Sequence, residues 1–193
     1  MSSENNKFPQ KRIVITGAGS GLGRALALRF ARDSWRVGIA DIKLDGAEET
    51  LKLVRAAGGD GFVQHCDIAL EADFATLAER VQKEWQRLDL LINNAGDASS
   101  GSVEATPLKD WEWMLNINLL GVVRGCRAFV PMLLKQRNGH IVNIASFAAI
   151  ASAPGMAVGL STKCVTPAAS YCRTAPIISS LPPIGMRMAT SKY

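Results

Sequence analysis

The sequence predicts a doubly wound α/β domain with a parallel sheet. Strand-like apolar runs alternate with helix-period segments over about three quarters of the 193 residues, as repeated βαβ units require. A glycine-rich segment follows the first apolar run and leads into a helical pattern. The chain is 48% hydrophobic and 20% charged, which is ordinary for a globular protein, and its length suits one domain with a sizeable core.

The apolar runs place five strands along the chain. We expect them at Arg12–Thr16, Arg36–Ala40, Gly61–Cys66, Leu88–Asn93 and Gly139–Ala145. Between the strands, apolar residues recur at helical spacing, and such stripes indicate helix faces packed on the core. One stripe is Leu44, Ala47, Leu51 and Val54, ended by Gly58-Gly59; another is Phe74, Leu77, Ala78, Val81 and Trp85.

A longer helix is expected over residues 107–137. Pro107 suits a first helical turn, whereas Pro131 predicts a kink or a break. Trp111 and Trp113 cannot share one helical face, so at least one of them should cover a surface or an interface.

The segment Thr16 to Gly23 (TGAGSGLG) lies between the first strand and the first helix. Backbone N–H groups at a helix N-terminus favour an anion, and a pyrophosphate can approach closely where glycines carry no Cβ. The spacing differs from the G-x-G-x-x-G fingerprint, because position 22 is Leu. A flexible loop could have the same composition, but the position between strand and helix favours phosphate binding.

The T-G-x-x-x-G-x-G spacing and Asn93-Asn94-Ala95-Gly96 after the fourth strand resemble the short-chain dehydrogenase/reductase family over residues 12–163. The resemblance implies a Rossmann-like sheet in the order 3-2-1-4-5, truncated at its C-terminal side. It also implies an NAD(P)-dependent oxidoreductase acting on a small-molecule alcohol or carbonyl. The implied cofactor contacts are Thr16, Gly17, Ser20, Gly21, Leu22, Gly23, Asp41, Asp67, Ile68, Asn94, Ala95, Gly96 and Lys163.

Asp41 at the end of the second strand indicates which dinucleotide is bound. A carboxylate there can accept hydrogen bonds from ribose hydroxyls and would repel a 2′-phosphate. Positions 20 and 42, where the family places partners of that phosphate, hold Ser and Ile. NAD(H) is therefore favoured over NADP(H), although Lys43 leaves the second open. A turn or cap role is the alternative interpretation of Asp41.

The resemblance also implies a catalytic set. Asn118 matches the asparagine that holds a relay water, Ser146 the serine that bonds the substrate oxygen, and Lys163 the catalytic lysine. The family's tyrosine stands four residues before that lysine, and here this position is Gly159. Glycine donates no proton, and general acid–base catalysis contributes about 10²–10⁴-fold. We therefore expect impaired turnover.

The composition changes after Lys163. We divide the chain into a polar segment 1–11, a dinucleotide-binding domain 12–163 and an atypical tail 164–193, which holds four prolines and no acidic residue. A homo-oligomer is one expectation, although the family's usual dimer helices are incomplete here and its later strands have no counterpart in this tail. Two alternatives stay open: a non-catalytic NAD-binding module, or a frame-altered or truncated product of such an enzyme gene.

Charge and cysteine content bear on partners and compartment. Residues 1–112 hold 17 acidic and 14 basic residues, whereas residues 113–193 hold 8 basic and none acidic. These charges are scattered and no recognition motif accompanies them, so we expect no nucleic-acid partner. We expect no membrane span and no signal peptide. Four cysteines without metal-ligand spacing suggest no bound metal and free thiols in the cytoplasm.

Overall fold

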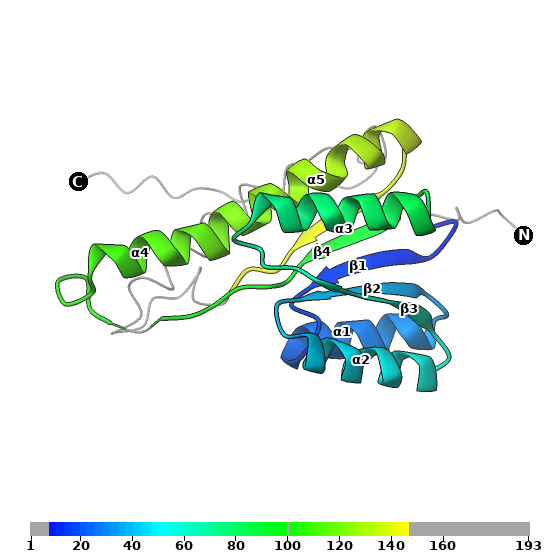
Figure 1. Cartoon of the computed structure of the whole chain (residues 1–193), viewed down its shortest axis with the longest axis horizontal. Helices are drawn as coiled ribbons and strands as arrows, with labels where there is room; N and C mark the ends of the chain where they lie inside the picture. Colours follow the sequence, from blue (N-terminus) through cyan, green and yellow to red (C-terminus); the bar gives the residue numbers. More distant parts are fainter. Residues whose placement is uncertain (1–7, 100, 147–193) are drawn as a thin grey trace, which may run out of the picture.

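The computed structural model describes residues 8–99 and 101–146, and these form a three-layer α/β arrangement. A five-stranded parallel sheet has the order β3-β2-β1-β4-β5, which confirms the predicted order. Helices α1 and α2 cover one face of this sheet, and α3 and α5 cover the other (Figure 1). The predicted tail 164–193, Gly159 and Lys163 lie outside the described residues.

The strands run close to their predicted positions. They are β1 (Arg12–Thr16), β2 (Arg36–Asp41), β3 (Asp60–His65), β4 (Leu90–Asn93) and β5 (His140–Asn143). The predicted starts at Leu88 and Gly139 and the predicted end at Ala145 were wrong, because register pairing begins at Leu90 with His140 and ends at Asn93 with Asn143. Central β1 is buried from Ile13 to Thr16, as expected for a strand covered on both faces.

Two apolar clusters fill the spaces between sheet and helices. The first joins β1, β2 and β4 to α1 (Gly21–Arg32) and α2 (Leu44–Ala56), and the second joins the opposite face to α3 (Glu71–Glu84) and α5 (Gly121–Gln136). The predicted helix stripes are confirmed with one exception. Leu44, the first residue of α2, is 46% exposed.

The segment expected as one long helix has three parts. It consists of α4 (Leu108–Leu115), a π-helical turn η1 (Asn116–Leu120) and α5, which ends at Gln136 with Arg137 in a left-handed conformation. Pro131 does not break α5, and its side chain is exposed. Pro107 precedes the first turn rather than belonging to it.

By length and composition, Leu108–Gln136 could cross a membrane, with a mean hydropathy of 1.5 in its most apolar window. This differs from the sequence expectation that no stretch is long enough. Phe129 and Leu133 are nevertheless fully buried against strand residues such as Val14 and Leu91, so apolar side chains of this run serve the core.

The strand order sets where a ligand can bind. The chain passes outward from β1 to β2 and β3, and then returns to the other side of β1 to form β4 and β5. The connections after β1 and β4 therefore leave in opposite directions. At such a switch point, a crevice opens outside the carboxyl ends of the strands, and ligands of open α/β sheets bind there.

Candidate functional site

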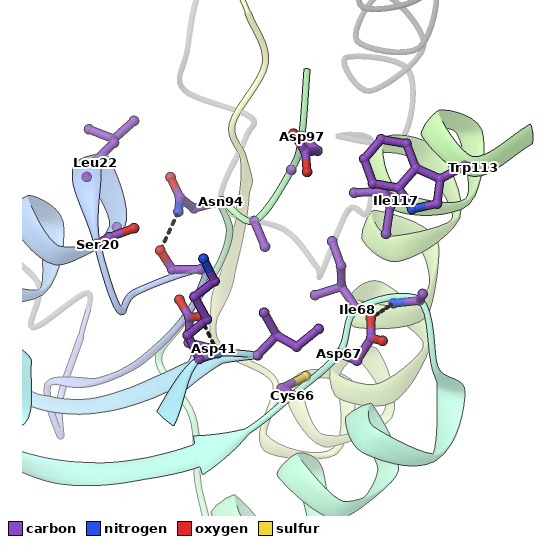
Figure 2. A pocket seen from close by; sticks show the side chains of 18 residues that line it. Ser20, Leu22, Asp41, Cys66, Asp67, Ile68, Asn94, Asp97, Trp113 and Ile117 are labelled. Carbon is purple, nitrogen blue, oxygen red and sulfur yellow. Dashed lines mark hydrogen bonds between the residues drawn. The ribbon is translucent and has the colours of Figure 1, made fainter. Parts of the chain in front are cut away.

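A cleft of about 650 Å³ lies at this switch point. Its walls come from the turn after β1, the segments after β2, β3 and β4, and one side of the α4–η1 helix. Figure 2 shows Ser20 and Leu22 on one side, Trp113 and Ile117 on the opposite side, and Asn94 and Asp97 between them. Of the predicted cofactor contacts, the structure places these in the lining: Gly17, Ser20, Gly21, Leu22, Gly23, Asp41, Asp67, Ile68, Asn94, Ala95 and Gly96.

The glycine-rich turn brings backbone to the cleft where a side chain would block it. A Cβ at Gly23 would lie 2.1 Å from the carbonyl oxygen of Gly17, so only glycine lets α1 begin this close to β1. Gly21 has φ +51° and open space where a Cβ would be. The first turn of α1 thus faces the cleft with its N–H groups, and the helix dipole favours an anion there.

Asp41 accepts two backbone hydrogen bonds, one from this turn and one from its own segment after β2. Gly19 N–H donates to Oδ2 at 2.7 Å, and Lys43 N–H donates to Oδ1 at 2.9 Å. The carboxylate therefore has a local turn-stabilising role and also lines the cleft. Each carboxylate oxygen can accept more than one hydrogen bond, so these contacts leave acceptor capacity toward the cleft. The two interpretations of Asp41 made from the sequence are compatible.

Thr16 and Asn94 join the ends of β1 and β4. The Thr16 hydroxyl accepts N–H bonds from Asn94 and Ala95, both at 3.1 Å, and the Asn94 side chain donates to the carbonyls of Thr16 and Gly17 at 2.9 and 3.2 Å. Thr16 is 2% exposed, so it supports the cleft from below rather than lining it. Asn93 bonds Asn143 at 2.9 Å and ties β4 to β5.

The segment after β3 forms another part of the wall through Asp67 and Ile68. Asp73 on α3 accepts the N–H of Asp67 at 2.8 Å and lies 3.2 Å from His65 Nδ1, which holds this segment against the helix. Burial and neighbouring carboxylates raise the pKa of the Cys66 thiol to about 12. Cys66 therefore stays protonated near neutral pH and is a poor nucleophile.

Asn118 is 2% exposed and lies in the π-helical turn. Its side-chain oxygen accepts the N–H of Asp97, and its amide donates to the Asp97 carbonyl, both at 3.0 Å. This fixes the segment after β4 onto the helix. Ser146 is half-buried and follows β5 at the same edge of the sheet. Neither residue lines the cleft itself, and their catalytic roles remain predictions.

Sequence reasoning missed seven of the lining residues. Five of them lie within two residues of a predicted cofactor contact: Ile42, Lys43, Cys66, Ala69 and Asp97. The other two, Trp113 and Ile117, come from the helix. Trp113 and Ile117 are four residues apart and therefore share one helical face. The predicted surface role of a tryptophan could have located them, because Trp113 is 46% exposed and lies in the cleft wall.

The family of this chain follows from its similarity to known proteins. A family model described as short chain dehydrogenase matches residues 11–167. The chain belongs to the short-chain dehydrogenase family. The predicted resemblance to this family is therefore confirmed, together with the Rossmann-like strand order.

Named short-chain dehydrogenase relatives are longer than this chain. It is 35% identical over 150 residues to a Mycobacterium tuberculosis protein named "Putative oxidoreductase SadH", a match that covers 78% of this chain and 54% of SadH. It is 35% identical over 184 residues to the probable oxidoreductase EphD of the same species, covering 95% of this chain and 30% of EphD. The chain therefore spans about half or less of these relatives.

Solved short-chain dehydrogenase structures share the fold. A Burkholderia phymatum enzyme in complex with NAD has a TM-score of 0.79 and 34% identity, over 82% of this chain and 57% of that chain. An NAD⁺-bound xylitol dehydrogenase has a TM-score of 0.80 and 29% identity, over 83% of this chain and 62% of that chain.

Proposed function

We propose that this chain binds NAD(H) in the switch-point cleft, as part of an oxidoreductase that transfers a hydride between the cofactor and a small alcohol or carbonyl. The observation that carries the proposal is that one cleft is lined by both the N-terminal turn of α1 and the Asp41 carboxylate. The first suits a pyrophosphate, and the second suits two ribose hydroxyls. Two NAD-bound relatives with the same fold support this assignment.

The choice of NAD(H) over NADP(H) follows from Asp41. Its charge is held at the glycine turn by the bond from Gly19, where it would face a 2′-phosphate with like charge. Titration of the protein's fluorescence with NADH should therefore show saturable binding, and NADPH should bind more weakly. The absence of saturable binding of either cofactor would overturn the proposal.

An Asp41→Asn variant tests the charge with little change in shape. It keeps an oxygen for one backbone hydrogen bond and removes the negative charge, so we expect the ratio of the NADPH to the NADH Kd to fall by about tenfold. Asp33→Asn is the matched control, because Asp33 is an exposed acid beyond the far end of α1. The ratio should be unchanged in that variant.

We propose further that turnover of this chain is low, because Gly159 stands where the family has its tyrosine. When bound, NAD(H) supplies the hydride chemistry. The chain's own part would be to orient the substrate oxygen through Ser146, with Lys163 and Asn118 assisting proton transfer. A Gly159→Tyr variant should raise NADH-linked turnover on a panel of secondary alcohols and ketones by about 10²–10⁴-fold. Cofactor binding without turnover in both proteins would instead favour a non-catalytic NAD-binding module.

A further inference from the structure

Arg124 on α5 does not line the cleft, but it is bonded to two segments that carry the cleft wall. One nitrogen, Nη1, donates to the carbonyl oxygen of Ile68 at 3.3 Å and to that of Asn116 at 3.1 Å. The other, Nη2, donates to the side-chain oxygen of Asn116 at 2.6 Å. The side chain is half-buried, so these charge-assisted bonds are partly shielded from water.

The contact to Asn116 is made at the first residue of the π-helical turn η1. A π-helical turn is an unfavourable insertion within an α-helix and persists where other contacts hold it. Gly121 N–H donates to the Asn116 carbonyl oxygen, which is the bond that defines this wider turn, and Arg124 donates to the same oxygen. If the turn relaxed by one residue, side chains within it would rotate by about 100° around the helix axis.

The orientation of Asn118 depends on this turn. Asn118 is one of the turn's five residues, and its two hydrogen bonds to Asp97 hold the segment after β4 in place. On the other side, Ile68 packs closely on the turn's end, since a Cβ at Gly121 would lie 3.0 Å from Ile68 Cδ1. A single guanidinium thus connects the wall after β3 with the helical turn that anchors the wall after β4.

We propose that Arg124 is a positioning residue for the cleft: it stabilises the π-helical turn, keeps Asn118 directed at Asp97 and fixes Ile68 against the same turn. Its role in cofactor binding rests on the proposed function. Its role in holding the two walls together does not, because every contact in the argument lies within the chain.

The test measures hydrogen–deuterium exchange of the Asp97 amide, which donates to Asn118. Arg124→Met keeps an unbranched apolar stem and removes all donors, so Asp97 should exchange about tenfold faster while the amides of β1 are unchanged. Arg127→Met is the matched control, because Arg127 is on the same helix, 72% exposed and paired only loosely with Glu71 at 3.6 Å. In Arg127→Met, the Asp97 amide should exchange at the wild-type rate.

The inference is overturned if Asp97 in Arg124→Met exchanges at the wild-type rate, if β1 accelerates equally, or if Arg127→Met has the same effect. Should Arg124→Met fail to fold, Arg124→Lys decides by the same criteria, because one ammonium cannot replace the two-nitrogen fork. The Kd for NADH should also rise by about fivefold in Arg124→Met alone. If the wild type binds no NADH, the proposed function fails, whereas the exchange comparison still decides the role of Arg124.

Discussion

Replacing Thr16 with Val tests the joint between β1 and β4. Valine has nearly the same shape as threonine but cannot accept a hydrogen bond, so the N–H groups of Asn94 and Ala95 would lose the oxygen that both now share at 3.1 Å. The site is 2% exposed, which keeps water from replacing the hydroxyl at its own position. The substitution should therefore act on the connection after β4 and leave the apolar core filled.

The magnitude follows from two lost hydrogen bonds. Each contributes about 1 kcal/mol net, and a stranded N–H that is partly shielded from water adds to the loss, so Thr16→Val should lower the free energy of unfolding by about 2–3 kcal/mol. Thr16→Ser keeps the hydroxyl and removes one methyl, which costs about 1 kcal/mol. Compared with the wild type, the valine variant reports the loss of the hydroxyl and the serine variant reports the loss of the methyl.

Urea unfolding followed by circular dichroism measures this difference. The midpoint should shift more in Thr16→Val than in Thr16→Ser, with the same slope in denaturant for both. A valine variant as stable as the wild type would refute the reasoning, because it would mean that the shared oxygen contributes nothing to the joint.

Three further results are expected. Gly23→Ala should lose about 3 kcal/mol in urea unfolding, because its Cβ would meet Gly17 O at 2.1 Å; Gly21→Ala, with open space at φ +51°, should lose only about 1 kcal/mol, and equal losses would contradict the steric argument. Asp89→Ala should lose about 3 kcal/mol, seen as a lower Tm, because this fully buried carboxylate accepts two backbone N–H bonds. The raised pKa of Cys66, about 12 against 9.0, means that the unfolded chain binds fewer protons between pH 9 and 12, so stability should fall there by up to about 1.4 kcal/mol per pH unit; Cys66→Ala should lack this part of the slope, and identical slopes would contradict it.

Local patterns in the sequence were enough for the fold and for much of the cleft. The run Ile13-Val14-Ile15 predicts a strand buried on both faces, and it is fully buried in the structure. The glycine-rich turn and the segment Asn93–Gly96 predict that the backbone at the ends of two strands lies against a ligand. Only small residues let a ligand approach the backbone so closely. Eight of the eleven predicted cofactor contacts that line the cleft come from these two segments, and the other three, Asp41, Asp67 and Ile68, follow β2 and β3.

Tertiary structure alone decided how distant segments meet. Trp113 and Ile117 face the cleft because the helix crosses the switch point; the sequence indicates that a tryptophan covers a surface, but not which surface. The hydrophobic periodicity of the sequence likewise does not indicate the π-helical turn at Asn116–Leu120. The one residue inserted there is held by hydrogen bonds such as those from Arg124 to Asn116. Strands and helices follow from period and propensity, which are properties of neighbouring residues. The partners of Asn118 and Arg124 depend on packing between segments that are distant in the chain, and the sequence alone cannot show them.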